Sequence, residues 1–176
     1  MRLLMRQIPC FIFAVLTLFL CSPIRVFAAQ RDHIVILDAG HGGEDGGAVS
    51  ADGTPESGIN LQITRQLAEL MTFMGYDVML TREGEDAVYS PEAVTLREKK
   101  VSDLNNRVSM INQQEHAFMI SIHQNSLPGH PKVHGAKVFY NSVIPAHRAG
   151  TIVQRSMNCA VNGEDRPVTP IDGTIF

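Results

Sequence analysis

Residues 33–48 read His33-Ile-Val-Ile-Leu-Asp-Ala-Gly-His-Gly-Gly-Glu-Asp-Gly-Gly-Ala48. The first six residues form a short apolar run that ends in a turn, which is typical of a buried strand. The glycines that follow disfavour a strand, so the chain is expected to form a loop at the strand's carboxyl end. Ligands of open α/β sheets bind at that edge. This stretch therefore predicts a strand of an α/β sheet that ends in a candidate binding loop.

The segment after this loop has the periodicity of a helix. Its apolar residues recur at steps of three and four, and Gly75 stands where a C-cap glycine is expected. Glu56 lies at the start of the helix. We expect one apolar face, formed by Ile59, Ile63, Leu67, Leu70, Met71 and Met74.

The rest of the chain alternates strand and helix patterns. Strands are expected at residues 77–81, 117–123 and 135–140, and helices at residues 103–112 and 147–159. Asp103 is the expected N-cap of its helix, and the charged segment 82–100 is expected to be a surface loop. This order predicts an α/β fold with an open, largely parallel sheet and helices on both faces. Because an apolar run starts at residues 174–176, we expect a C-terminal strand and helix to be missing.

The first 28 residues have the order of an export signal. Arg2 and Arg6 precede the apolar stretch Cys10–Cys21, and small residues follow near Ala28. The apolar part is only slightly shorter than a membrane span of about 20 residues. We therefore expect residues 1–28 to be a signal peptide or an uncleaved membrane anchor. The remainder would act outside the cytoplasm, either secreted or anchored to the membrane.

Residues 29–176 fit one domain of ordinary size. Without the three arginines of the leader, they carry 12 basic and 18 acidic residues, a formal net charge of −6. They contain no block rich in lysine and arginine, so nucleic acid is excluded as the partner. Cys159 is the one cysteine beyond the leader, so it cannot form an internal disulfide. We expect Cys159 to pack on a helix.

Two histidines and a glutamate are candidate metal ligands. His41 and His123 follow strands that are predicted to be parallel, so both would emerge at one edge of the sheet, near Glu56. Two imidazoles and one carboxylate, with water in the fourth position, are the ligand set of a catalytic zinc site. These residues could equally be hydrogen-bonded loop histidines and a glutamate that favours the helix dipole. A phosphate cradle is disfavoured, because the G-x-G-x-x-G spacing fails and Glu44 and Asp45 would repel phosphate.

Six motifs follow one another along the chain. They are Asp38-Ala-Gly-His41-Gly-Gly, Glu56-x-x-x-Asn60-Leu61, Gly75-Tyr76-x-Val78-x-Leu80-Thr81-Arg82, Leu104-x-x-Arg107-Val108-x-x-Ile111-Asn112, Ser121-Ile122-His123-x-Asn125 and Gly135. In this order and spacing, the sequence resembles the zinc-dependent N-acetylmuramoyl-L-alanine amidases from about Ile34 onward. Its long charged segment and short leader are most similar to those of the germination-specific, spore-cortex member of that family.

The resemblance implies a function and a set of site residues. The reaction would be hydrolysis of the amide between N-acetylmuramic acid and L-alanine in peptidoglycan, with Zn²⁺ held by His41, Glu56 and His123. Asn125 would orient the substrate or a ligand, or form a turn. Arg82 and Arg107 match the family, although a structural role is more usual for such arginines. The enzyme would act outside the cytoplasm, with the spore envelope as one location.

The sequence departs from the family at the general base. The family's base is a second glutamate in a Val-Glu-x-Gly-Phe segment on a later strand, which we expect beyond Phe176. Glu44 and Asp45 are conceivable substitutes. Without a base, the chain would be a non-catalytic muropeptide-binding module or an inactive fragment. A zinc peptidase or deacetylase of similar architecture is a further alternative. The remaining histidines are interpreted as ordinary surface or loop residues: His33, His116, His130, His134 and His147.

Overall fold

The computed structural model describes residues 33–126, 129–130, 132–141 and 146–171. The expected leader at residues 1–28 and the apolar run at residues 174–176 lie outside the described residues. Among the helices of the described part, none combines the length and the apolar character that crossing a membrane requires.

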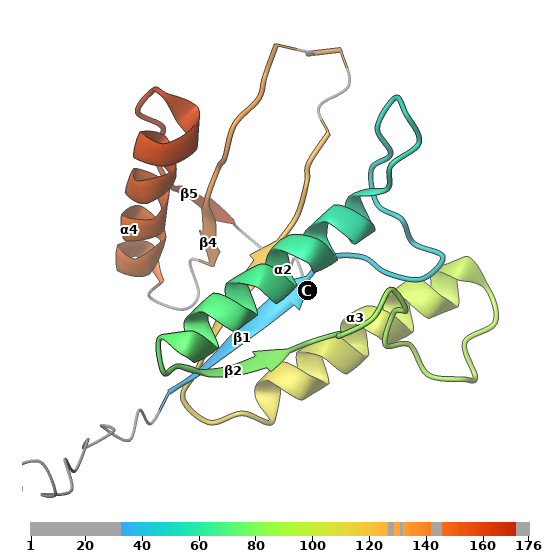
Figure 1. Ribbon diagram of the computed structural model, residues 1–176. Coiled ribbons are helices and arrows are strands. Elements are labelled where there is room, and N and C mark those ends of the chain that lie inside the picture. The colour runs from blue at the N-terminus through green and yellow to red at the C-terminus, as the bar shows by residue number, and fades with distance from the viewer. Residues whose placement is uncertain (1–32, 127–128, 131, 142–145, 172–176) are drawn as a thin grey trace, which may run out of the picture. The chain divides into compact units, whose positions relative to one another are not determined.

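Three parallel strands form the main sheet. They are β1 (Ile34–Ala39), β2 (Asp77–Leu80) and β3 (Ala117–Ile122), in the order β2-β1-β3 (Figure 1). β1 pairs with both neighbours, and Ile36 and Leu37 at its centre are 0% exposed. Burial on both faces explains why the sequence of this strand is an uninterrupted apolar run. The prediction of an α/β fold with an open parallel sheet is confirmed.

Helix α2 (Glu56–Phe73) packs against all three strands. It ends as predicted: Gly75 has φ 83°, its N–H donates to Thr72 O, and the Tyr76 N–H donates to Met71 O. These two bonds form a Schellman motif, in which glycine tolerates the left-handed backbone.

The buried face of α2 differs from the predicted apolar face. Ile63, Leu70 and Met74 are each at least 40% exposed, whereas the buried residues are Glu56, Asn60, Leu61 and Thr64. Hydrogen bonds from this helix explain why polar residues are buried, because the Asn60 side chain donates to Gly40 O at 3.2 Å. The helix is therefore oriented partly by its contact with the loop after β1, which apolar periodicity does not reveal.

Helix α3 (Leu96–Asn112) begins earlier than predicted. The expected loop 82–100 is helical from Leu96, and Asp103 is a buried residue within the helix instead of its N-cap. The helix starts with a capping box: the Glu98 N–H donates to Thr95 Oγ1 and the Thr95 N–H donates to Glu98 Oε2. The Thr95-x-x-Glu98 pattern was the sequence signal for this start.

Thr95→Ala is expected to lower the free energy of unfolding by about 1 kcal/mol, because it removes the side-chain acceptor of the capping box. The measurement is the urea unfolding midpoint of the purified protein. Ser109→Ala serves as the control, since Ser109 is an exposed position of the same helix. Equal midpoints for Thr95→Ala and the unmodified protein would contradict the capping role.

A second group of elements follows β3 along the chain. β4 (Phe139–Asn141) and β5 (Thr169–Ile171) form a parallel pair, and α4 (His147–Met157) continues into the π-helical turn η1 (Asn158–Asn162). β4 is shorter than the predicted strand 135–140, because Ala136 is bonded to the side chains of Asn162 and Gln154. Cys159 lies exposed in η1, so the prediction that it packs on a helix was wrong.

Candidate metal centre

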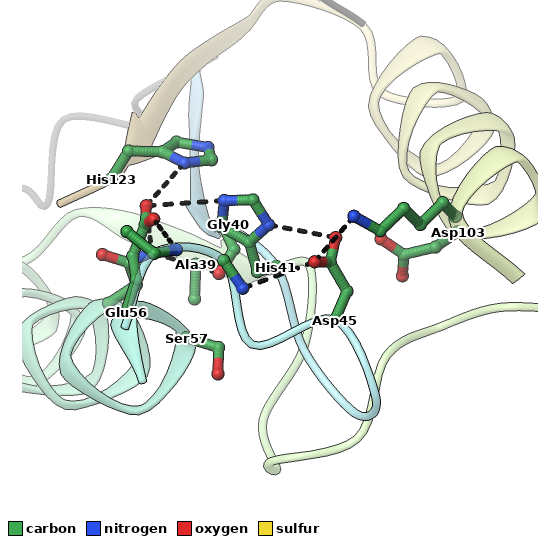
Figure 2. A network of polar contacts seen from close by, with 12 residues as sticks. Ala39, Gly40, His41, Asp45, Glu56, Ser57, Asp103 and His123 are labelled. Atoms are coloured by element: carbon green, nitrogen blue, oxygen red, sulfur yellow. Dashed lines mark hydrogen bonds and ion pairs between the residues drawn. The ribbon is translucent and has the colours of Figure 1, made fainter. Parts of the chain in front are cut away.

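The sheet places His41 and His123 side by side. β1 and β3 pair as far as Ala39 and Ile122, and each strand is followed within two residues by its histidine. Both imidazoles contact Glu56, the first residue of α2 (Figure 2). Glu56 Oε1 lies 3.5 Å from His41 Nε2 and 3.0 Å from His123 Nδ1. The three candidate ligands therefore converge at one edge of the sheet.

The spacing of these atoms fits a zinc ion. One ligand atom from each of the three residues lies within 4.8 Å of the other two. Ligands at about 2.0–2.1 Å from a tetrahedral zinc are about 3.4 Å from each other, and the two Glu56 distances of 3.5 and 3.0 Å lie on either side of that value. His41, Glu56 and His123 could thus hold a metal ion, and their donor atoms suit zinc.

Glu56 is held as an ionised carboxylate. Its 5% exposure would raise its pKa, but hydrogen bonds from the Ala48 N–H (2.9 Å), the Gln124 N–H (2.8 Å) and the Asn60 side chain (3.2 Å) lower it further than burial raises it. A metal ligand must be deprotonated, so these donors prepare Glu56 for that role. A glutamate that only favoured the helix dipole would not require burial between two imidazoles.

Two glycines give the ligand side chains room to meet. A Cβ atom on Gly40 would lie 2.3 Å from His123 Cε1, and one on Gly47 would lie 2.6 Å from His41 Cδ2 and 2.7 Å from Glu56 Oε2. Gly47 also has φ 69°, which a larger residue adopts only with strain. The loop is therefore rich in glycine because the ligands themselves occupy the space beside it.

Two buried arginines fix the backbone of this loop. Arg107 donates to the carbonyl oxygens of Ala39 and His41, each at 2.8 Å. Arg82 donates to the carbonyls of Ala39 and Gly40 and to Ser57 O at the start of α2. Both arginines thus position the chain that carries His41, which agrees with the structural role that the sequence favoured.

Asp38 anchors the arginine contacts from within β1. It accepts hydrogen bonds from Thr81 Oγ1 and Ser121 Oγ, each at 2.6 Å, and pairs with Arg107 Nη1 at 2.7 Å. Burial raises its pKa, but the Arg107 charge and these hydroxyl donors together lower it below its ordinary value. Sequence reasoning gave Asp38 no role of its own, although a carboxylate that ends an apolar strand was a visible signal.

Asn125 is the one predicted site residue that the structure does not join to the cluster. It is exposed, and none of the hydrogen bonds found among the described residues connects its side chain to His41, Glu56 or His123. Its role in orienting substrate stays a prediction. Of the other histidines, His33 contacts His116, and His147 packs against the ring of Tyr140.

A cavity of about 150 Å³ lies beside His41 and His123. Tyr89, Leu96 and Leu104 line it, so the early start of α3 supplies part of its wall. Glu44 and Asp45, the conceivable substitutes for the general base, also line it. Both are engaged in ion pairs, with Lys99 and Lys100 respectively. Burial raises the pKa of Asp45, but its hydrogen bonds with His41 and Lys100 lower it further, which weakens Asp45 as a base.

Comparisons with known proteins agree with this geometry. The family model Amidase_3, described as N-acetylmuramoyl-L-alanine amidase, matches residues 35–175. The chain is 38% identical over 108 residues to the germination-specific N-acetylmuramoyl-L-alanine amidase of Bacillus subtilis, and this alignment covers 61% of this chain and 44% of the relative. It is 33% identical over 106 residues to the N-acetylmuramoyl-L-alanine amidase AmiA of Escherichia coli, and this alignment covers 60% of this chain and 32% of the relative. The chain thus spans less than half the length of these two relatives.

Solved structures share the fold. The CwlD amidase from Clostridioides difficile, determined in complex with the GerS lipoprotein, aligns with a TM-score of 0.75 and 36% sequence identity. The alignment covers 79% of this chain and 72% of that one. The amidase AmiC2 of Nostoc punctiforme aligns with a TM-score of 0.63 and 25% identity, covering 80% of this chain and 69% of the other.

Proposed function

The chain belongs to the N-acetylmuramoyl-L-alanine amidase family, and we propose that it hydrolyses the amide between N-acetylmuramic acid and L-alanine in peptidoglycan. The observation that carries the proposal is the convergence of His41, Glu56 and His123, with Glu56 Oε1 within 3.5 Å of both imidazoles. The same residues are expected to bind Zn²⁺. Family membership and ligand geometry thus support one reaction class, the hydrolysis of an amide at a metal centre.

The residues around the centre have separate tasks in this reaction. When bound, zinc polarises the scissile carbonyl and lowers the pKa of water. Glu56 contributes a fixed negative charge, because the Ala48 and Gln124 N–H groups keep it ionised. The cavity beside His41 would receive the part of the stem peptide next to the scissile bond. We assign neither Glu44 nor Asp45 as the general base, because both are engaged in ion pairs.

The biological setting is part of the proposal. The germination-specific relative from Bacillus subtilis supports a role in the spore cortex, during sporulation or germination. The substrate is a wall polymer, and the export-like leader at residues 1–28 supports action outside the cytoplasm, either secreted or membrane-anchored. The similar Clostridioides difficile amidase was solved with the GerS lipoprotein, so a lipoprotein is a candidate partner for this chain as well.

The test is incubation of the zinc-loaded full chain with purified peptidoglycan, followed by mass spectrometry of the soluble products. An amidase releases stem peptides that begin with a free L-alanine amine. A peptidase would release shorter peptides, and a deacetylase would leave the stem peptides attached. If the protein sediments with peptidoglycan and releases nothing, it is the non-catalytic muropeptide-binding module, and the proposed activity is wrong.

A further inference from the structure

Asp45 stands between a metal ligand and a lysine of α3. Its Oδ2 atom lies 3.1 Å from His41 Nδ1, and its Oδ1 atom lies 2.9 Å from Lys100 Nζ. The Gly47 N–H also donates to Oδ1, at 3.3 Å. Each carboxylate oxygen therefore has a separate set of contacts: one faces His41, and the other is held by Lys100 and the loop backbone.

The backbone around Asp45 is also fixed. The Gly42 N–H donates to Asp45 O at 2.9 Å, and the Asp45 N–H donates to Gly42 O at 3.1 Å, which closes a short turn directly after His41. His41 itself has φ 61°, a left-handed backbone that is uncommon outside glycine. This backbone aims the two ring nitrogens of His41 in opposite directions, Nδ1 at Asp45 and Nε2 at Glu56 (Figure 2).

The direction of the ring decides where its proton resides. A carboxylate only accepts hydrogen bonds, and His41 Nδ1 is within hydrogen-bond distance of Asp45 Oδ2, whereas its Nε2 lies 3.5 Å from Glu56 Oε1 without a hydrogen bond. A neutral imidazole in this position therefore carries its proton on Nδ1. The lone pair is then on Nε2, the atom that faces Glu56 and the expected metal position. Outer partners of this kind orient metal-binding histidines and raise their basicity, and their removal typically costs about 10–100-fold in metal affinity.

We propose that Asp45 is a positioning residue that sets the tautomer of His41 for zinc, and that Lys100 fixes Asp45 in that position. The inference rests on the zinc site proposed above. It makes α3 part of the metal centre, although Lys100 lies 55 residues after Asp45 and has no contact with a candidate ligand among the interactions of the described residues. Because Lys100 and the Gly47 N–H occupy Oδ1, only Oδ2 is directed at His41.

The neighbouring pair Glu44 and Lys99 provides a matched control, because each residue directly precedes Asp45 or Lys100 in the sequence. Lys99 pairs with Glu44, just as Lys100 pairs with Asp45. Glu44 forms no hydrogen bond or ion pair with the three ligands among the interactions found in the described part of the chain. Lys99→Met and Lys100→Met thus remove the same charge from the same helix, but only Lys100→Met acts on the partner of His41.

The experiment measures the zinc dissociation constant of the full chain by competition with a chromogenic chelator. We expect Asp45→Asn to weaken zinc binding by about 10–100-fold, Lys100→Met to weaken it less, and Lys99→Met to leave it unchanged. Nitrogen NMR of the zinc-free, ¹⁵N-histidine-labelled protein supplies a second measurement. The His41 signals should show the Nδ1–H tautomer in the unmodified protein, and a mixture of tautomers in Asp45→Asn and Lys100→Met.

The outcomes separate this inference from the proposed function. If the unmodified protein binds one zinc and Asp45→Asn binds it equally well, the positioning role of Asp45 is wrong. The same holds if the tautomer of His41 is unchanged in both Asp45→Asn and Lys100→Met. If the unmodified protein binds no stoichiometric zinc, the metal site itself is wrong. Should Asp45→Asn fail to fold, the comparison of Lys100→Met with Lys99→Met still decides the question.

Discussion

Replacing His41 or His123 with alanine is expected to abolish stoichiometric zinc binding. Each histidine is one of three candidate ligands in the part of the chain that the structure describes. Glu56 Oε1 lies at 3.5 and 3.0 Å from their nitrogens, so no small shift of the other two residues would replace the missing nitrogen. Catalytic zinc sites keep three protein ligands and one open position. With two ligands left, the ion would have two open positions, and dialysis should remove it.

The measurement is the zinc content of purified, dialysed protein by elemental mass spectrometry. His33→Ala is the control, because His33 contacts the His116 backbone and ring and is not one of the three candidate ligands. The unmodified protein and this control should each retain about one zinc per chain, the occupancy of a single three-ligand site. One equivalent of zinc in both His41→Ala and His123→Ala would show that the ion binds elsewhere.

The sequence predicts that the candidate ligands lie close together, because sheet geometry brings them to one edge. His41 and His123 each follow an apolar run, and parallel strands that pair side by side end at the same edge. Glu56 was identifiable as the first acidic residue of the following helix. The two strands and the helix start each have a local sequence pattern, which predicts the proximity of the three residues. Their role as zinc ligands is what the resemblance to the amidases implies.

The supporting residues were less predictable, because their contacts join segments far apart in sequence. Lys100 pairs with Asp45 and Arg107 pairs with Asp38, and no periodicity links such residues. The same cause shifted the predicted start of α3. The first residues of this helix, 96–100, contain four charged side chains and one leucine, so they were interpreted as part of the loop 82–100. The order of elements follows from local patterns, whereas buried polar networks depend on tertiary packing.

Arg107→Met is expected to lower the free energy of unfolding by about 3–5 kcal/mol, the usual result of removing one partner of a buried ion pair. Arg107 and Asp38 are each 2% exposed and pair at 2.7 Å, and Arg107 Nε pairs with Asp103 at 2.8 Å. Methionine retains much of the side-chain volume. The variant would therefore lose charge compensation at two carboxylates and donors to the carbonyls of Ala39 and His41.

The destabilisation should depend on pH through Asp38. In the unmodified protein, burial raises the Asp38 pKa, but the Arg107 charge and the hydroxyl donors lower it below the value of about 3.9 expected in the unfolded chain. This stabilisation is therefore present above about pH 4 and is lost as the pH falls through the folded-state pKa. In Arg107→Met the burial remains without the opposing charge, so the Asp38 pKa should rise. The stability difference should then be largest near neutral pH and should narrow on acidification.

Guanidinium unfolding of zinc-free protein at pH 7 and at about pH 3.5 measures both effects, because the Asp38 contribution is lost only below about pH 4. Arg97→Met is the control, since Arg97 is exposed on the same helix. Arg107→Lys keeps the positive charge but lacks the planar guanidinium donors, so it should lose less stability than Arg107→Met. A loss that is equal at both pH values would mean that Asp38 does not carry the effect. A loss no larger than that of Arg97→Met would mean that the loop bearing His41 is held without Arg107. In that case the loop would be positioned by its remaining contacts, such as those of Arg82 and Asn60 with the carbonyl of Gly40.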